Sequence, residues 1–487
     1  MKRRDFMAVA AGGLFGAAAR AMSAPASTKL NILYIVSEDN GPEIGCYGTP
    51  IKTPHLDALA GEGVRFTNAY VAQAGCSPSR AAFLTGLYPH QNGQIGLATW
   101  NYSMYSRGIP NVVTTLKKAG YRTGIIGKLH VNPENAFPFD FKAIPGSNFG
   151  RKNMGSYTDN AERFFRESDK PFYLQINHPD AHWPFLKQVD GCPSKPLKGE
   201  DVDALPYMGL NHPELKQLTA DYYNCMMRLD SHVGDLLNAL EKSGKAEKTV
   251  VIYIGDHGAD LLRGKRTCYE GGVKIPMIIR WPGGVVSQVR DELVSTLDLF
   301  PTFCRIAGVS PPASLPGRSL EPIVKGERPD WRKYLFTEFH VHSHHNPWPQ
   351  RSVRNYRYKL IHNPLTGTVN PGYAFSFSKR PKSGEAVLLA VAEPDVRRAY
   401  ALMKRPPEYE LYDLKTDPFE FHNLADDPAH LRQLNELVQQ LKDWQKKTGD
   451  VLGDSDNARK LFDMIQGAKL DRRTKLPYGE FMDLQNR

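Results

Sequence analysis

Four short apolar runs, each ending in charged or imidazole side chains, constrain the fold of this 487-residue chain more than any other feature. They are residues 31–37, 122–127, 171–177 and 248–255. All are rich in Ile, Val and Tyr with little alternation, which is typical of strands covered on both faces. Stretches with helical spacing lie between them, among them residues 53–63 and 215–244. The sequence therefore predicts an α/β fold with a largely parallel sheet.

The side chains that follow these runs have the chemistry of a binding or catalytic site. In open α/β sheets the ligand crevice lies at the carboxyl ends of the strands. If these side chains had only structural roles, each of the four strand ends would need its own explanation. We therefore expect one shared site. The side chains concerned are Glu38 and Asp39, Lys128 and His130, His178, Asp180 and His182, and Asp256 and His257.

Residues 1–26 are predicted to be a signal peptide of the twin-arginine type. Arg3 and Arg4 precede a mildly apolar stretch, and small residues follow it. A disordered basic tail is the alternative. No cysteine follows the apolar stretch, so we expect no lipid anchor, and no apolar run is long enough for a membrane-spanning helix. The signal predicts a periplasmic or secreted protein with the twin-arginine export machinery as a partner.

Charge and cysteine content narrow the possible partners. The net charge of +10 is compatible with an anionic substrate, although an ordinary basic surface explains it equally well. No basic stretch is interleaved with aromatic residues, so nucleic acid is not an expected partner. The six cysteines show no Cys-x-x-Cys pair and no regular spacing. This argues against a metal cluster and leaves one or two disulfides open.

The C-terminal part has a different pattern and is predicted to be a smaller α+β domain. Residues 351–363 alternate like an exposed antiparallel strand, and residues 430–449 have the spacing of an amphipathic helix. We place the boundary near residue 348. This gives an N-terminal catalytic domain at 27–348 and a C-terminal domain with an antiparallel sheet at 349–487.

The segment CSPSRAAFLTG, which begins at Cys76, predicts a helix with a cysteine at its N-terminus. Ser77 is suited to capping and Pro78 to the first turn, and Arg80 lies about one turn on from Cys76. The helix dipole and the guanidinium favour negative charge there. From the residues alone, Cys76 is either a thiolate nucleophile of low pKa or a buried structural cysteine.

The same segment matches the C-x-P-S-R-x-x-x-L-T-G signature of the sulfatases, and the chain resembles that family over essentially its whole length after the signal. Residues 269–284 and 410–425 are similar to two further family segments. The resemblance implies an alkaline-phosphatase-like sandwich, with a large mixed, mostly parallel sheet covered by helices. It also implies that Cys76 is oxidised to formylglycine, an aldehyde, by a separate maturation enzyme.

The resemblance also implies catalytic roles for residues of this chain. Residue 76, as formylglycine, would be the nucleophile, and Arg80 would orient and stabilise it. His182 would protonate the leaving oxygen or nitrogen. The basic residues that match the family's Lys-x-His and its second lysine are Lys128, His130 and Lys265. The two lysines would neutralise the charge of a sulfate group.

A divalent cation, usually calcium in this family, is the cofactor that the resemblance implies. Its ligands would be Glu38, Asp39, Asp256 and His257. The family pattern has two aspartates in the first pair, so Glu38 departs from it, with a longer arm that still offers an oxygen. Because calcium prefers oxygen ligands, His257 is the least expected of the four.

Within the sulfatases, three segments look like heparan N-sulfatases (sulfamidases). They are residues 76–97, 119–141 and 350–363. A histidine pair, His344 and His345, lies upstream of the last segment as it does in sulfamidases, in a loop that is either solvated or in contact with substrate. This chain departs from sulfamidases at position 265. It has lysine there, followed by Arg266, whereas sulfamidases have arginine at position 265.

The predicted function is hydrolysis of sulfate groups on a glycosaminoglycan, with N-sulfoglucosamine of heparan sulfate or heparin as the expected substrate. Within the same superfamily the alternatives are an O-sulfatase on another sulfated polysaccharide or aryl sulfate, and a phosphonate or phosphate ester hydrolase. An alternative from another class is a non-catalytic glycan-binding relative.

Overall fold

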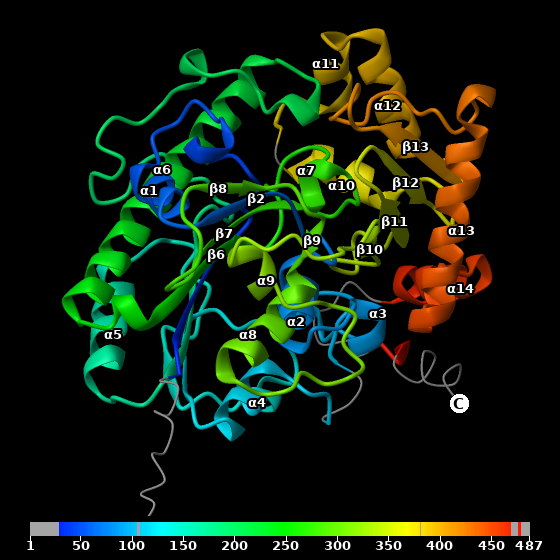
Figure 1. Ribbon diagram of the computed structural model, residues 1–487. Coiled ribbons are helices and arrows are strands. Elements are labelled where there is room, and N and C mark those ends of the chain that lie inside the picture. Colours follow the sequence, from blue (N-terminus) through cyan, green and yellow to red (C-terminus); the bar gives the residue numbers. More distant parts are fainter. Residues whose placement is uncertain (1–28, 105–107, 380, 469–475, 479–487) are drawn as a thin grey trace, which may run out of the picture.

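A computed structural model describes residues 29–104, 108–379, 381–468 and 476–478. The predicted signal peptide lies outside the described residues. None of the helices in these ranges is long and apolar enough to cross a membrane. The described chain forms one large and one small sheet with helices around them (Figure 1).

The large sheet confirms the predicted α/β class with a mixed, mostly parallel sheet. Its strands run in the order β4-β3-β5-β1-β6-β7-β2-β8, and β9 pairs with β2. Strand β7 is antiparallel to β6 and β2, whereas the other neighbouring pairs are parallel. The strands are β1 (Asn31–Ser37), β2 (Val64–Tyr70), β3 (Arg122–Gly127), β4 (Phe141–Ala143), β5 (Phe172–His178), β6 (Thr249–Gly255), β7 (Lys274–Arg280), β8 (Gln288–Arg290) and β9 (Val294–Ser295).

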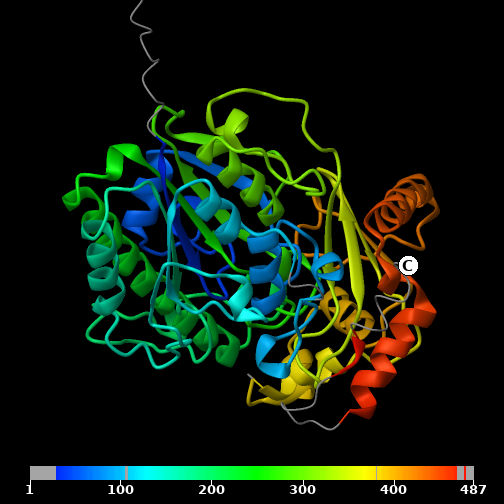
Figure 2. The ribbon, with the colours of Figure 1, turned by 90° about the horizontal axis from the view of Figure 1, so that it is seen from below.

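Helices cover both faces of this sheet, which explains why its central strands lack polar alternation (Figure 2). In β1, Leu33 and Ile35 belong to one core cluster, while Ile32 and Val36 belong to the other. The helices of the first face are α1 (Pro54–Gly61), α5 (Gly155–Arg166) and α6 (Pro213–Lys242). Those of the second face are α2 (Cys76–Thr85), α4 (Val112–Lys118) and α8 (Leu299–Ala307).

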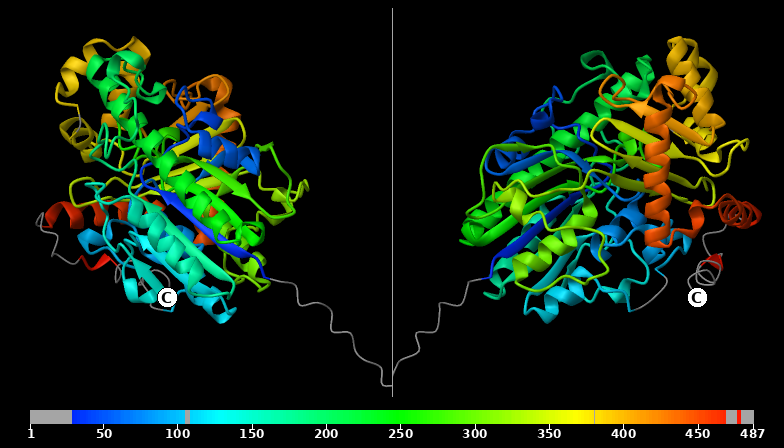
Figure 3. Two further views of the ribbon diagram at one scale, coloured as in Figure 1. Left: turned by 90° about the vertical axis from the view of Figure 1, so that its left-hand side faces the viewer. Right: turned by 45° about the vertical axis from the view of Figure 1, so that its right-hand side comes forward.

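The small sheet is antiparallel, in the order β10-β11-β12-β13. Its strands are β10 (Leu335–Phe339), β11 (Gln350–Arg354), β12 (Tyr358–His362) and β13 (Tyr409–Asp413). Helix α13 (Leu431–Thr448) packs across one face (Figure 3). The first strand precedes the boundary expected near residue 348, and the division into two domains stays a prediction. The remaining α-helices are α3 (Pro89–Asn92), α7 (Glu270–Val273), α9 (Glu321–Val324), α10 (Pro371–Lys379), α11 (Gly384–Ala390), α12 (Pro394–Lys404) and α14 (Ser455–Gly467).

The prediction of one exposed strand at residues 351–363 was wrong. The segment is a hairpin that contains most of β11 and all of β12, and these strands are almost wholly buried. Val353 and Leu360 pack under α13, while Ile361 belongs to the core cluster of the first sheet face. The alternating pattern therefore arises from two covered faces and not from one solvated face.

The loop after β5 is held by a buried ion network centred on Asp180. Its carboxylate accepts hydrogen bonds from Arg151 Nε at 2.9 Å and from Arg228 Nε and Nη2 at 2.8 and 2.7 Å. All three side chains are fully buried. Arg151 also donates to the backbone carbonyl of His182. Asp180 therefore anchors the segment that carries His182.

We expect Asp180→Asn to lower the free energy of unfolding by about 3–5 kcal/mol, because it leaves two buried guanidinium groups without their carboxylate. Burial by itself would raise the pKa of Asp180, but Arg151 and Arg228 hold it below its ordinary value. The stabilisation is therefore present above the ordinary carboxyl pKa and is lost as the pH falls below it.

Denaturant unfolding of the wild type and the variant at neutral and acidic pH measures this difference. The control is Asp169→Asn, an exposed carboxylate paired with Lys245, which should change the stability by less than about 0.5 kcal/mol. Equal losses in the two variants would contradict the anchoring role.

Candidate active site

Cys76 is the first residue of α2, so its side chain lies where the helix dipole favours negative charge. Only 1% of the residue is exposed. The prediction that Ser77 caps this helix was wrong, because the N-cap residue is Gly75. The Ser77 hydroxyl instead accepts a hydrogen bond from the backbone amide of Ala98 at 2.9 Å, which ties the loop at residue 98 to the start of α2.

Positive groups surround the thiol. Lys265 Nζ lies 3.3 Å from Cys76 Sγ, and His257 Nε2 lies 3.4 Å from it. Burial by itself would raise the pKa of the Cys76 thiol, but Lys128, Lys265 and His257 bring it well below its ordinary value. The site thus stabilises an anion at the position of residue 76.

Three buried carboxylates lie beside the thiol, and each has a cationic partner. The pairs are Lys128 Nζ with Glu38 Oε2 at 2.8 Å, Lys265 Nζ with Asp39 Oδ1 at 2.9 Å, and Arg80 Nη2 with Asp256 Oδ2 at 3.0 Å. The carboxylates follow β1 and β6, while Lys128 follows β3. The shared site expected from the strand ends is therefore present as a cluster.

Arg80 connects α2 to these strand ends. Besides Asp256, its guanidinium donates to the Asn177 side chain at 2.8 Å and to the Lys128 backbone carbonyl at 3.0 Å. These partners stand at the ends of β6, β5 and β3. The position of residue 76 relative to the sheet therefore depends on Arg80.

The acidic residues fit a hard divalent cation. Glu38 Oε1 is buried and has no hydrogen-bond partner among the described residues. His257 Nε2 lies 3.4 Å from Asp39 Oδ1 and 3.5 Å from Asp256 Oδ1, and its Nδ1 lies 2.9 Å from the Gly258 carbonyl oxygen. Burial would lower the pKa of His257, but chiefly Asp256, with Asp39, raises it to about 9. The His257 ring thus faces two carboxylates, and oxygen-rich donors of this kind suit calcium.

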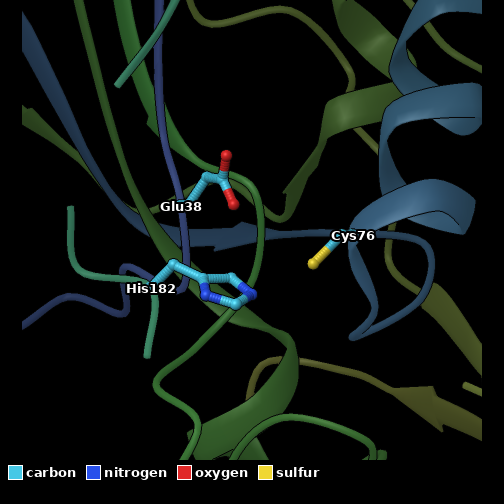
Figure 4. A group of neighbouring side chains, drawn as sticks. All are labelled: Glu38, Cys76 and His182. Carbon is cyan, nitrogen blue, oxygen red and sulfur yellow. The ribbon is translucent and has the colours of Figure 1, made fainter. Parts of the chain in front are cut away.

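Two further predicted histidines reach the same space. The ligand atoms of Glu38, Cys76 and His182 lie within 4.8 Å of one another, and the three side chains converge (Figure 4). The His182 ring stacks on Phe149 at 4.1 Å between centroids, and its Nδ1 lies 2.6 Å from the Trp183 carbonyl oxygen. Burial, followed by Lys128, lowers the pKa of His130 to about 3, so this imidazole is neutral.

His342 is a neighbour of residue 76 that the sequence did not reveal. Its Cδ2 lies 3.6 Å from the position that a Cβ on Gly75 would take. It stands in the loop of His344 and His345, which was read as either solvated or in contact with substrate. His344 is 1% exposed and packs on Trp100 at 4.9 Å, whereas His345 is exposed. No spacing rule marks His342, because it lies in a loop and not on a periodic element.

Comparisons with known proteins agree with this geometry. Residues 30–309 match the family model described as sulfatase. Residues 255–377 match a second model, described as the C-terminal part of N-sulphoglucosamine sulphohydrolase.

Two curated relatives resemble nearly the whole chain. An ulvan-active sulfatase of Formosa agariphila is 30% identical over 452 residues, which cover 89% of this chain and 83% of that protein. Human N-sulphoglucosamine sulphohydrolase is 32% identical over 471 residues, covering 86% of this chain and 90% of the human one. Among solved structures, a Bacteroides fragilis protein described as a putative sulfatase matches with a TM-score of 0.69 at 22% identity. The match covers 89% of this chain and 99% of that one.

The low pKa of the thiol gives a test of the geometry in metal-free protein with residue 76 left as cysteine. Lys265→Met removes the ammonium next to Sγ, so the pKa of Cys76 should rise by about 1–3 units. The measurement is the ultraviolet absorbance of the thiolate against pH, after subtraction of the Cys76→Ala signal.

The other cysteines interfere little, because burial raises the pKa of most of them. The values are about 12 for Cys46, Cys225 and Cys268 and about 11 for Cys304. All six cysteines are free thiols, so no disulfide complicates the titration. Exposed Lys118→Met is the matched control. A titration of Cys76 that Lys265→Met leaves unchanged would contradict the contact.

Proposed function

Because this chain belongs to the sulfatase family and is a sulfuric ester hydrolase acting on sulfated glycans, we propose that its substrate is N-sulfoglucosamine of heparan sulfate or heparin. The proposed reaction type is supported mainly by the buried cluster at Cys76. Three cations and three carboxylates surround a helix N-terminus there. Support for the N-sulfate comes from the match of residues 255–377 and from the human relative.

The proposed nucleophile is formylglycine, formed from Cys76 by a maturation enzyme. Its aldehyde takes up water to give two hydroxyl groups on one carbon. One hydroxyl oxygen attacks sulfur, and the bond from sulfur to the leaving nitrogen or oxygen breaks, which leaves a sulfate ester on residue 76. Loss of sulfate from that carbon then restores the aldehyde.

The cluster suits each part of this reaction. Lys128 and Lys265 neutralise charge on the sulfate oxygens, in a site whose dipoles are already oriented. His182 lies on the Glu38 side of residue 76 and gives a proton to the leaving atom. The residues that would hold calcium are Glu38, Asp39, Asp256 and His257. A bound calcium ion supplies Lewis-acid polarisation of a sulfate oxygen.

An O-sulfatase acting on another sulfated glycan is the second candidate. The observation that favours it is the ulvan-active relative. A panel of N-, 2-O- and 6-O-sulfated sugars separates the candidates, and cleavage of an O-sulfate alone would overturn the N-sulfate proposal.

Export in the folded state is the proposed route to the periplasm or medium. Arg3 and Arg4 support recognition by the twin-arginine machinery. That machinery carries folded proteins, so residue 76 would be oxidised in the cytoplasm before export.

Maturation predicts a defined mass change at residue 76. In active protein, the tryptic peptide with this residue should carry formylglycine in place of cysteine. Cys76→Ala should abolish turnover and keep the folded state, as judged by circular dichroism. Normal activity in this variant would exclude residue 76 as the nucleophile.

Protonation of the leaving group by His182 predicts that His182→Ala lowers the rate on N-sulfoglucosamine more than the rate on an aryl sulfate. An amine leaves poorly unless its nitrogen gains a proton, so His182→Ala should lower kcat on N-sulfoglucosamine by about 100- to 10,000-fold. An activated aryl sulfate, whose phenolate leaves unaided, should lose much less. A folding defect would lower both rates alike, and equal losses would remove His182 as the acid.

The cation predicts a reversible loss of stability as well as of activity. Prolonged chelation should lower the thermal midpoint and kcat, and added calcium should restore both. Glu38→Gln should raise the calcium concentration needed for this, because it removes one charged oxygen ligand. Asp203→Asn, at an exposed carboxylate, should not. Active protein without any divalent metal by elemental analysis would contradict the site.

A further inference from the structure

A groove of about 740 Å³ lies where the small sheet meets α13. Its lining comes from the start of β10, the second half of α13, the segment after α2 and the loop at residues 313–318. Among the described residues, the groove shares no lining side chain with the cluster at Cys76. Its volume lies in the range of small-molecule sites in proteins, and neither the fold nor the reaction accounts for it.

Aromatic rings line the groove beside α13. Tyr334 and Phe336 are two residues apart and so share one side of the chain, whereas Leu335 between them packs into the core of the large sheet. The Phe336 ring stacks on Trp444 at 5.0 Å between centroids, and Tyr88 meets Trp444 edge-on at 5.0 Å. Trp444 and Tyr88 are buried, but Tyr334 and Phe336 are half-buried. Part of each of these two rings is therefore open to a ligand with an apolar face, such as a sugar ring.

Positive charge predominates among the side chains that line the groove. The charged lining residues are the cations Arg318, Arg332, Lys333 and Lys447 and the carboxylate Asp443. Arg332 is neutralised by its ion pair with the buried Asp298. The other three cations exceed Asp443 by two positive charges, so the groove is complementary to an anionic ligand.

Asp298 holds the basic edge of the groove in place. Its Oδ1 accepts a hydrogen bond from the backbone amide of Arg318 at 2.7 Å, and its Oδ2 accepts one from Arg332 Nη1 at 2.9 Å. The Arg318 side chain donates to the Asp330 carbonyl at 3.2 Å and lies 5.9 Å from the centroid of the Trp331 ring. This edge is thus ordered before any ligand binds, which lowers the entropic cost of binding.

We propose that this groove is a second binding site for a sulfated glycan chain, separate from the cluster at residue 76. Sulfate groups of the chain bind to Arg318, Lys333 and Lys447, and sugar rings lie against Tyr334 and Phe336. The proposal rests on the proposed function only through its substrate class, a sulfated glycan, and does not depend on which sulfate is cleaved.

The second site lies at the far end of α2 from residue 76. Cys76 begins this helix, whereas Tyr88 comes shortly after its last residue, Thr85. Ten residues of helix span about 15 Å, which is longer than one sugar ring. A single sugar in the cluster at Cys76 therefore does not reach the groove. A long chain held in the groove raises the local concentration of sulfate groups near residue 76.

The test measures binding in full-length Cys76→Ala protein, in which the probes are not consumed. The probes are a long heparan sulfate oligosaccharide and the single sugar N-sulfoglucosamine, and calorimetry gives Kd for each. Replacing both exposed lysines, Lys333→Ala with Lys447→Ala, should raise the ratio of the long-chain Kd to the single-sugar Kd by about 3- to 30-fold. The long-chain Kd should also become less sensitive to salt, because two charges are lost.

The matched control removes two exposed lysines elsewhere, Lys242→Ala with Lys248→Ala. Lys242 ends α6 and Lys248 precedes β6, so both lie away from the groove. This pair has the same loss of net charge and should leave the ratio of the two Kd values unchanged. A DNA oligonucleotide of equal charge is the comparison probe, because it has phosphates but no sulfated sugar rings, and it should bind more weakly than heparan sulfate.

Each result decides for or against the groove. A ratio that rises in the Lys333 and Lys447 variant, and not in the control, supports the proposal. An unchanged ratio, an equal rise in the control, or equal binding of the oligonucleotide would overturn it. A dimer in solution that this variant dissociates would assign the groove to a second copy of the chain instead. Because binding is measured without turnover, a wild type that cleaves no sulfated sugar would overturn the proposed function alone.

Discussion

The pairing of three buried carboxylates with three buried cations is the interaction on which the site depends. Glu38, Asp39 and Asp256 are each 0% exposed. The desolvation free energy of burying them as isolated charges would be too high for a stable fold. Lys128, Lys265 and Arg80 neutralise them one to one, so these six side chains carry no net charge without a metal. A divalent cation would add two positive charges, and the single negative charge of a sulfate ester or sulfamate would offset one of them. The proposed cation and the anionic substrate are therefore electrostatically linked.

This balance exists because of where the strands lie in the sheet. Strands β3, β5, β1 and β6 are consecutive neighbours and parallel, so their carboxyl ends meet along one edge. Helix α2 lies against that edge and contributes Cys76 and Arg80 from a single turn. The small sheet closes the remaining side through the loop of His342. The three carboxylates of the cluster all follow strands of the large sheet.

The sequence predicted the large sheet better than the small one, and the reason is physical. Strands covered on both faces read as continuous apolar runs, and residues 31–37 and 122–127 were predicted to the residue. The hairpin at residues 351–363 was read as one exposed strand, because the sequence cannot show that α13 covers one of its faces. The turn at residues 355–357 was missed with it.

The candidate site was predicted residue by residue only where a motif fixed it. Spacing and the signature brought together Glu38, Cys76 and Lys265, which the structure places in contact or nearly so. Asp180 has the same position after a strand, yet it anchors Arg151 and Arg228 instead. His342 escaped notice because a loop has no period. The direction of the side chain determines whether Asp180 and His342 reach the site. Tertiary packing sets that direction, so the sequence does not show it.

Discrimination between N- and O-sulfates cannot come from the sulfate cradle, because both substrates present the same anion to it. Lys265 already donates to both oxygens of Asp39 and contacts Cys76 Sγ, so its hydrogens are committed within the cradle. The neighbouring guanidinium of Arg266 is paired with Asp260 and lies 5.2 Å from the Phe375 ring. Selection must therefore rest on contacts to the sugar and on proton supply to the leaving atom, and a lysine at position 265 is compatible with either substrate.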